Sequence, residues 1–437
     1  MTVSRKTLLI PESTRTRAQR RVVFTLSASQ LLSGVGNGAG LAIGSLMAVE
    51  LTGSNAFAGA ATTAISVAGA LSALPLAALA VKRGRRVALS FGYFLAGLGA
   101  VGMMLAPVLE SFAVLMLGAA LLGVGSAANL QARFAATDLA EDATRGRDLG
   151  LVVWAITIGA VAGPNLIGPG AVLGQGLGLP PMSGPFLFSL AGMVLAILVL
   201  NIGLRPDPID LARAWEAADG IAPHPPAVGR RRGSLATGLV AVRESPGAAL
   251  GISTIVVAHL VMVGVMSMTP VHLKDLAAIP GHEMHGGTAD ILVVIGFVIS
   301  LHIAGMYALS PLVGSLADRI GQPRMMLAGQ GVLVAAVLVA GLGADSRAAV
   351  TTGLVLLGLG WSMCTVSGSA FLASRVERGR RVLVQGVSDT LMGAAGALGA
   401  AGSGLLLAWL GYAGLGYLCL GFILLVAVFC VREVARA

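Results

Sequence analysis

Charged and aromatic residues are scarce in this sequence of 437 residues. Only 11% of the residues are charged and 5% are aromatic, whereas 56% are hydrophobic, and the mean hydropathy is +0.87. Soluble domains are roughly a quarter charged, because charged side chains cover the surface that faces water. This composition excludes a soluble globule, a disordered chain and a collagen-like chain. We therefore expect a membrane protein.

Cysteine is scarce as well, and motifs for chemistry are few. Cys364, Cys419 and Cys430 all stand inside apolar runs, so neither a disulfide framework nor a cysteine-built metal site is predicted. His282 and His285 have the spacing of a weak metal site, but a polar, glycine-bearing stretch around them is more typical of a solvated loop. No Walker sequence is present. We expect no metal, no cofactor and no enzymatic activity.

Apolar runs that are long enough to cross a bilayer recur along the chain, since a spanning helix needs about 20 apolar residues. This pattern predicts an all-α membrane protein. Twelve such runs cover residues 22–51, 55–81, 88–107, 112–135, 149–168, 185–203, 247–272, 290–313, 326–343, 348–373, 385–409 and 412–431.

The basic residues give these runs an orientation. With both termini in the cytoplasm, every Lys and Arg except Lys274 and Arg347 falls on the cytoplasmic side. The positive-inside rule favours this arrangement, and it explains the net charge of +9 without nucleic acid. Arg20, Arg21 and the next apolar run imitate a secretion signal, but the run is too long for a signal core. We expect a multi-pass protein of the cell membrane.

One long polar stretch divides the runs into two sets of six. Its prolines mark it as a linker, within which residues 209–218 are predicted to form a short surface helix. The predicted parts are a cytoplasmic tail (1–21), a six-helix bundle (22–203), a cytoplasmic linker (204–246), a second six-helix bundle (247–432) and a C-terminal tail (433–437).

The two halves share a motif. The second half reads G-S-L-A-D-R-I-G from Gly314 to Gly321, and the first half reads A-A-L-A-V-K-R-G at an offset of 237 residues. Such weak internal symmetry is typical of transporters that are built from parallel repeats. The pattern G-x-L-A-D-R-x-G in this loop, together with the six-loop-six layout, resembles the major facilitator superfamily. The resemblance covers nearly the whole chain and implies that fold.

In that superfamily this loop is understood to act as a latch between the two bundles. The resemblance therefore implies conformational-switch residues here: Gly314, Asp318, Arg319 and Gly321. Asp318 is expected to pair with an arginine or with the N-terminus of a neighbouring helix. The first copy carries Ala77 and Val81 in place of glycine and aspartate, so its latch cannot rest on a carboxylate. The alternative is an ordinary tight loop with anchoring charges.

The fifth predicted helix has a glycine pattern that ends in Gly-Pro. Close-packing glycines and a proline that bends the helix would give a tight, kinked contact with a neighbour. The run resembles the fifth-helix motif that marks proton antiporters among the superfamily's exporters. Its residues here are Gly150, Gly159, Gly163, Pro164 and Gly168.

Few ionisable groups lie at membrane depth, where each is costly and therefore a candidate for function. His259, His302, Asp389 and Glu50 are the proton-coupling candidates. A histidine titrates near neutral pH, and a carboxylate can alternate between charged and neutral forms. The alternative for the two histidines is an interhelical hydrogen bond, and for Glu50 a position at the membrane interface. The alternative for Asp389 is pairing with Arg381 or another arginine of the loop that precedes its helix.

The remaining polar and aromatic candidates are assigned to a substrate cavity. They are Asn37, Gln131, Trp154 and Trp361, with Arg133 as either a lining residue or an anchor. The arginine that many proton-coupled exporters of the superfamily carry within helix 4 is missing from the stretch Ala119–Gly123. The first half is thus expected to hold no charged side chain deep in the membrane. The mostly apolar lining of the cavity favours a lipophilic or amphipathic substrate.

The leading hypothesis is a monomeric secondary transporter that exports a small lipophilic or amphipathic compound in exchange for protons. Its partners are then the small-molecule substrate, protons and the lipid bilayer, and not nucleic acid. An importer or facilitator of a neutral nutrient is one alternative on the same fold. A membrane receptor or scaffold that transports nothing is the other.

Overall fold

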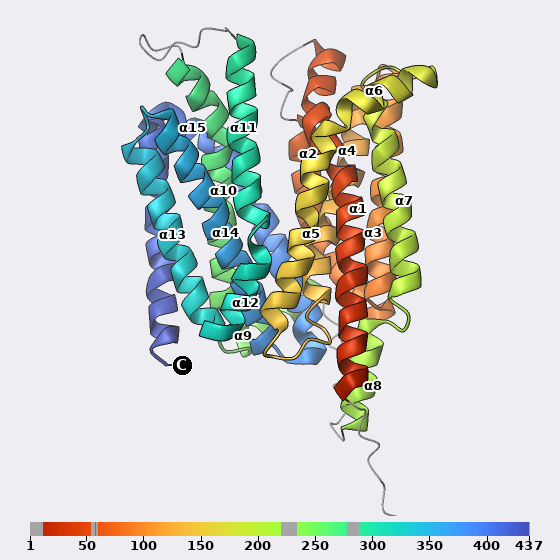
Figure 1. The fold of residues 1–437 in the computed structure, drawn as a ribbon, viewed down its shortest axis with the longest axis vertical. Coiled ribbons are helices and arrows are strands. Elements are labelled where there is room, and N and C mark those ends of the chain that lie inside the picture. Colours follow the sequence, from red (N-terminus) through yellow and green to blue (C-terminus); the bar gives the residue numbers. More distant parts are fainter. Residues whose placement is uncertain (1–11, 54–56, 58–59, 220–233, 278–287, 437) are drawn as a thin grey trace, which may run out of the picture.

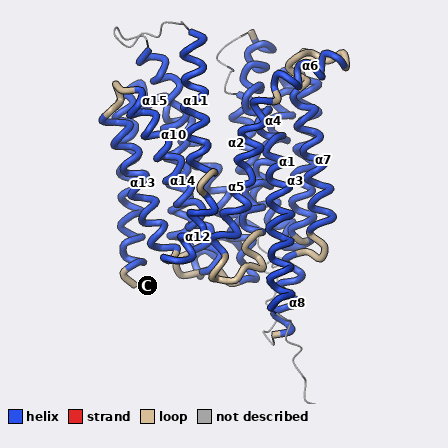
Figure 2. The backbone as a smooth tube through the Cα atoms, viewed as in Figure 1, coloured by secondary structure: helices blue, strands red, loops and turns tan. Residues whose placement is uncertain are grey.

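Helices form nearly all of the computed structural model, which describes residues 12–53, 57, 60–219, 234–277 and 288–436. Within those ranges Figure 2 shows helices and loops but no strand. The helices of the first half are α1 (Glu12–Thr52), α2 (Ala60–Arg83), α3 (Arg85–Leu105), α4 (Phe112–Ala135), α5 (Arg145–Asn165), α6 (Ile167–Gly176) and α7 (Pro185–Gly203). Those that follow are α8 (Pro208–Ala218), α9 (Ser234–Glu244), α10 (Ala248–Ala277), α11 (Thr288–Tyr307), α12 (Ser310–Ile320), α13 (Gln322–Leu342), α14 (Arg347–Arg375) and α15 (Arg378–Val434).

Helix boundaries follow local sequence signals. The hydroxyl of Ser111 accepts a hydrogen bond from the N–H of Val114 at the start of α4, and Ser346 caps α14 in the same way. In the linker, Asp207 caps α8, which is the short helix predicted over residues 209–218. Among the described residues, nine helical stretches are long and apolar enough to cross a membrane.

The predicted runs differ from the helices in detail at three places, each because of proline or glycine. The run 149–168 is interrupted after Gly163-Pro164, where α5 gives way to α6. The run 290–313 is divided within one candidate span, because α11 ends at Tyr307 and α12 begins at Ser310, with Pro311 in its first turn. The last two runs are continuous in α15 except at Gly411, whose φ of 68° is accessible to glycine at little cost.

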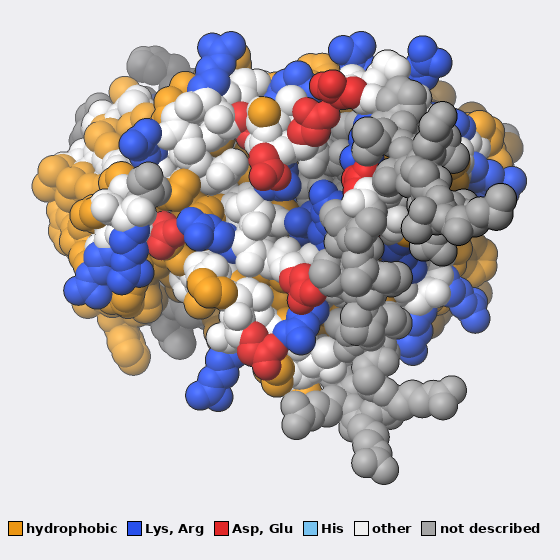
Figure 3. Space-filling view, turned by 90° about the horizontal axis from the view of Figure 1, so that it is seen from below, with side chains coloured by type: hydrophobic (Ala, Val, Ile, Leu, Met, Phe, Trp, Pro, Cys, Tyr) orange, Lys and Arg blue, Asp and Glu red, His pale blue; other side chains and the backbone are white. Residues whose placement is uncertain are grey.

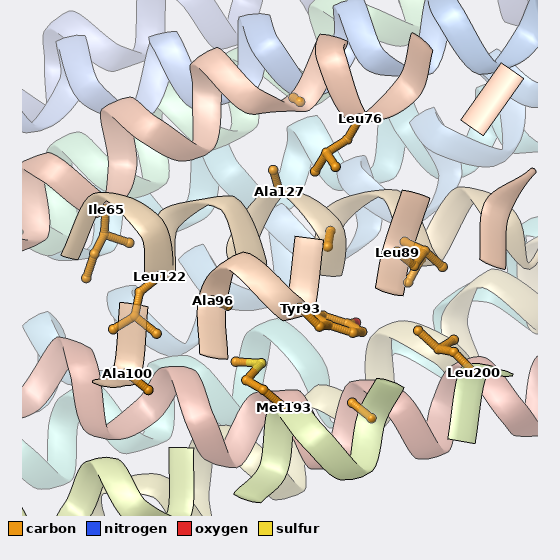
Figure 4. Close-up of a cluster of buried hydrophobic side chains, with 14 of the residues drawn as sticks. Ile65, Leu76, Leu89, Tyr93, Ala96, Ala100, Leu122, Ala127, Met193 and Leu200 are labelled. Carbon is orange, nitrogen blue, oxygen red and sulfur yellow. The ribbon is translucent and has the colours of Figure 1, made fainter. Parts of the chain in front are cut away.

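The helices form two bundles that stand side by side (Figure 1). In the first, α1 packs on α5 and α7, and α3 packs on α4. In the second, α13 packs on α14, and α10 packs on α15. Each bundle has its own apolar core. Figure 4 shows part of the first core, where Tyr93, Leu122 and Met193 meet from three different helices.

The two bundles meet at one end, which we call the basic end. It carries α8, α9, the turn between α12 and α13, and the C-terminal residues (Figure 1), and arginine and lysine side chains surround it (Figure 3). Three apolar clusters join the bundles there, centred on Phe134 of α4, Val81 of α2 and Leu149 of α5. Toward the opposite end the helices of the two bundles diverge (Figure 1).

Glycines allow the helix backbones inside each bundle to touch. A Cβ atom added at Gly99 would lie 2.6 Å from the backbone N of Leu122, and one added at Gly118 would lie 2.7 Å from that of Met103. These contacts hold α3 against α4 at a distance that no larger residue allows.

Replacing Gly118 by Val should therefore destabilise the first bundle. The new side chain meets backbone rather than a flexible side chain, and overpacking of this kind typically costs about 1–3 kcal/mol. Thermal unfolding of the purified protein in detergent measures the effect. Gly331→Val is the matched control, because no atom lies within 4 Å of a Cβ at Gly331. Equal unfolding temperatures for the two variants would contradict the close contact.

Candidate functional site

A buried ion pair joins the two bundles. The guanidinium of Arg133, near the end of α4, donates to the carboxylate of Asp389 in α15 over 2.6 Å. The side chains are 3% and 0% exposed. The second carboxylate oxygen, Oδ2, has no hydrogen-bond partner among the described residues. A pair of opposite charges is thus held inside the contact between the halves, with one oxygen free to accept a proton.

This pair corrects two expectations. The first half does contain a deep charge, since Arg133 is buried rather than a surface anchor. Asp389 pairs with Arg133 of the other bundle and not with Arg381 or another arginine of its own preceding loop. The sequence signal that was available is the position of Arg133 itself, inside an otherwise apolar helix end, where a charge requires a partner. Its partner, 256 positions away, could not be read from the sequence.

Two of the predicted residues, His259 and Trp361, lie together. The indole N–H of Trp361 donates to Nδ1 of His259 over 3.1 Å, and Tyr307 packs edge-on against Trp361 with ring centroids 5.6 Å apart. Because an indole nitrogen is only a donor, Nδ1 of His259 must be the acceptor, and the ring proton of the neutral imidazole lies on Nε2. Tyr307 was not predicted, since nothing in the sequence links it to helices α10 and α14.

The other polar candidates are dispersed. Nδ1 of His302 lies 2.7 Å from the carbonyl of Leu354 and ties α11 to α14. Gln131 donates to the carbonyl of Ala73 and so joins α4 to α2 inside the first bundle. Glu50 is exposed at the end of α1 far from the basic end. The side chain of Asn37 lies outside the described part of the chain.

A second buried arginine, which sequence reasoning counted only as an anchor, also spans the halves. Arg85 of α3 donates to Asp138 over 2.8 Å and to Gln385 of α15 over 2.7 Å. Gln385 stands one helical turn before Asp389 on the same face of α15. The two arginines therefore contact consecutive turns of α15 from the opposite bundle.

The motif of the second half forms a polar contact, which we call the carboxylate latch. Both oxygens of Asp318 accept hydrogen bonds of 2.8 Å from the backbone N–H groups of Gly146 and Arg147, at the N-terminus of α5. Asp318 was expected to pair with an arginine or with a helix N-terminus, and in the structure its partner is the N-terminus of α5. The helix dipole favours a negative charge at that position. A Cβ at Gly314 would lie 2.1 Å from the carbonyl oxygen of Gly146, so only glycine allows this approach.

The other motif residues surround this contact. Arg319 is exposed, and Gly321 ends α12 with a φ of 94°. The degraded first copy forms an apolar counterpart, in which Ala77 and Val81 of α2 pack with Val382 and Leu383 of α15. We call this cluster the apolar latch. The basic end is thus closed by one charged and one uncharged contact.

The glycines of α5 contact different neighbouring helices. A Cβ at Gly150 would lie 2.4 Å from the carbonyl oxygen of Ser310, whose hydroxyl donates to the carbonyl of Gly150 over 2.9 Å. Gly159 faces α1, because a Cβ at Gly34 would lie 3.1 Å from its Cα. Side-chain surroundings of Gly163, Pro164 and Gly168 lie outside the described part of the structure.

Trp154 stands apart from Trp361. It lines a cavity of about 1230 Å³ that is formed mainly by the first bundle, together with residues of α1 and α8 and with Arg378 of α15. No cluster of three or more His, Cys, Asp or Glu side chains that could hold a metal ion is found among the described residues. His282 and His285 fall outside them.

Replacing Asp318 by Ala should open the basic end. The change removes two hydrogen bonds to a carboxylate, each worth more than a neutral one, so the open population should rise about tenfold or more. Spin labels at the exposed positions Lys82 and Arg324, on opposite bundles, report the separation in a variant without the native cysteines. Asp345→Ala, an exposed carboxylate at the opposite end, is the control. An unchanged distance distribution for Asp318→Ala would favour the reading of an ordinary tight loop.

Comparisons with known proteins agree with this architecture. The family model of the Major Facilitator Superfamily matches residues 26–287 and 276–436. The "Uncharacterized MFS-type transporter" YdeG of Bacillus subtilis is 35% identical over 394 residues, which are 90% of this chain and 87% of that protein. The "Riboflavin transporter RfnT" of Brucella anthropi is 25% identical over 375 residues, which are 86% of each chain.

Solved structures of low identity share the fold. A bacterial homologue of the iron transporter ferroportin, in an outward-facing state, superposes with a TM-score of 0.69 at 17% identity, over 95% of this chain and 100% of that chain. The human organic anion transporter MFSD10 gives 0.68 at 18% identity, over 94% and 99%. With its two bundles, its carboxylate latch and these matches, the chain belongs to the Major Facilitator Superfamily and is a membrane transporter of that fold.

Proposed function

We propose that this transporter exports a small lipophilic or amphipathic compound across the cell membrane in exchange for protons, by alternating access. The basic end faces the cytoplasm, in accordance with the positive-inside rule. In this structure the bundles are in contact at that end, so the state described is closed toward the cytoplasm.

The single observation that carries proton coupling is the buried pair of Arg133 and Asp389. Separating the bundles breaks this pair, and the attraction between the two charges inside the low-dielectric contact opposes that separation. A proton on the free oxygen of Asp389 neutralises the carboxylate and weakens its attraction to Arg133. Proton uptake at Asp389 therefore favours opening toward the cytoplasm, and proton release favours closure.

The direction and the class of substrate rest on other features. Export is supported by the glycine pattern of α5, in which Gly150 contacts α12 of the other bundle and Gly159 contacts α1. A lipophilic or amphipathic substrate is supported by the aromatic group of Trp361, Tyr307 and His259. This group is aromatic and uncharged, without the fixed charge that a dicarboxylate or sugar phosphate requires, and in this closed state it is buried, with Trp361 3% exposed.

Asp389→Asn should remove the pH dependence of opening. In the wild type, lower pH protonates Asp389 and increases the open population at the basic end, whereas an amide at this position cannot titrate. The distance between spin labels at Lys82 and Arg324, measured from pH 5 to 8 in liposomes, tests this.

Folding and coupling are separated by a second pair of variants. Arg133→Gln alone leaves the Asp389 carboxylate without its partner and should lower the unfolding temperature, while Arg133→Gln with Asp389→Asn should largely restore it. Full pH dependence of the spin-label distance in Asp389→Asn would exclude Asp389 as the coupling group, even if the protein folds normally.

A second candidate function is transport of a neutral planar nutrient, riboflavin being the specific case. Two observations favour it: the relative named as a riboflavin transporter, and the aromatic group around Trp361. A flavin ring would stack on Trp361 once the bundle opens, because in this closed state Trp361 is 3% exposed and Nε2 of His259 faces Gly396 of α15.

Riboflavin should then bind, and its fluorescence should be quenched by stacking. Trp361→Phe should weaken the binding, because it removes the larger ring and the hydrogen bond that fixes the orientation of His259. A loss of about tenfold corresponds to one aromatic contact of this kind. Trp409→Phe, at a side chain that is 78% exposed, is the control. Unchanged riboflavin fluorescence at saturating wild-type protein would discard this candidate and leave the export proposal standing.

A further inference from the structure

The cavity of about 1230 Å³ borders the contact between the bundles, because its lining includes Arg378 of α15 and Arg147, whose N–H takes part in the carboxylate latch. Its lining includes neither Arg133 nor Asp389, and it comes mainly from α1, the α4–α5 loop, α5 and α8. The transport mechanism proposed above therefore gives this space no role.

One stripe of α1 forms a wall of this cavity. Thr16, Arg20, Phe24, Ala28 and Leu31 recur every three or four residues and so share one face of the helix. The stripe is polar at the basic end and apolar beyond it. On the facing helix α5 the order is the same, from Arg147 through Leu151 to Trp154. The cavity thus has a polar base and an apolar upper part.

The two helices close the cavity at its apolar end. A Cβ at Gly34 of α1 would lie 3.1 Å from Cα of Gly159 in α5, so the backbones touch above Leu31 and Trp154. Phe24 is 75% exposed and Trp154 is 40% exposed. Exposed aromatic side chains on a spanning helix contact lipid, so we read the apolar part as open to the bilayer.

The dimensions agree with one leaflet of a membrane. Arg20 and Leu31 are eleven residues apart, which is about 16 Å along a helix. Half of the hydrocarbon core of a bilayer is about 15 Å thick. A molecule in this space would have its polar group beside Arg20 and its apolar part beside Phe24, Leu31 and Trp154, in the orientation of a cytoplasmic-leaflet lipid.

The charges at the base leave an arginine available. Asp138 is paired with Arg85. Asp148 accepts a hydrogen bond from Gln19 and is paired with Arg147. Arg15 is bound to Asp219 of the linker. Arg20 has no ion-pair or hydrogen-bond partner among the described residues. Basic pockets between spanning helices on the cytoplasmic side are suited to phospholipid headgroups.

We propose that this cavity is a binding site for a phospholipid of the cytoplasmic leaflet, with the phosphate at Arg20 and an acyl chain between α1 and α5. The exposed Glu141 stands at the rim, where it accommodates a headgroup ammonium better than a second anion. The site is independent of proton coupling and of the identity of the transported compound.

Tryptophan quenching by phospholipids with brominated acyl chains tests this site. Two variants of the full chain keep one tryptophan each: Trp154 in the cavity, or Trp409 on the lipid-exposed surface. In detergent micelles, small mole fractions of brominated phosphatidylethanolamine, which carries an ammonium, should quench Trp154 to saturation. Quenching of Trp409 should instead rise in proportion to the lipid fraction.

Arginine variants provide the matched comparison. Arg20→Gln should raise the half-quenching lipid fraction of Trp154 about fivefold, the effect expected for one arginine at a headgroup. Arg17→Gln makes the same charge change on an exposed part of α1 outside the cavity and should change nothing. Lipid retained by each variant in native mass spectrometry, with all tryptophans present, gives the same comparison if a single-tryptophan chain fails to fold.

Three results would overturn the proposal. Parallel quenching of Trp154 and Trp409 would show an ordinary lipid-exposed surface. Equal thermal stabilisation by glycerol 3-phosphate and by phospholipid would show a site for a soluble anion. Equal lipid retention by the Arg17→Gln and Arg20→Gln variants would show that Arg20 does not bind the lipid phosphate.

Discussion

Closure of the basic end depends on the ion pair between Arg133 and Asp389. Each charge by itself would be expensive in the interior of the protein, and each is acceptable only beside the other. The two side chains belong to different bundles, so the position that satisfies both also fixes how the bundles meet. Phe134 follows Arg133 directly and places its ring in an apolar cluster of the second bundle. The charge is therefore surrounded by packing that keeps water away from it.

The two contacts beside this pair differ in their chemistry although they occupy related positions in the two halves. In the carboxylate latch, Asp318 accepts two backbone N–H groups at the start of α5. In the apolar latch, Val81 stands in place of the aspartate and packs against Leu383. An apolar contact has little geometric preference, whereas two hydrogen bonds to one carboxylate fix a single orientation. The carboxylate latch thus sets the angle of closure, and the apolar latch contributes buried area.

The sequence was sufficient for the architecture and for part of the site. Twelve apolar runs, a polar linker and a repeated motif predict two bundles, because a bilayer restricts the chain to spanning helices. The motif also pointed to Asp318, the positions of His259 and Asp389 inside apolar runs marked them as costly residues at depth, and Trp361 was assigned to the substrate cavity. Which of these meet could not be predicted, since Trp361 and His259 are 102 positions apart and Arg133 and Asp389 are 256 apart. The role of Arg133 stayed open between a lining residue and an anchor, because a helix-end arginine beside a basic loop has the same sequence pattern as a topology anchor.

The hydrogen bond from Trp361 to His259 limits where a proton can be held in this state. The indole N–H occupies Nδ1 of the imidazole, and protonation of that nitrogen would place two donors face to face. His259 is thereby kept neutral as long as Trp361 remains where it is. Asp389 has no such restriction, because its Oδ2 is unpaired among the described atoms and its other oxygen accepts from Arg133. In the proposed mechanism the carboxylate is therefore the group that binds the proton in the closed state. His259 is expected to titrate only when Trp361 turns away, a movement that a substrate stacked on the indole would oppose.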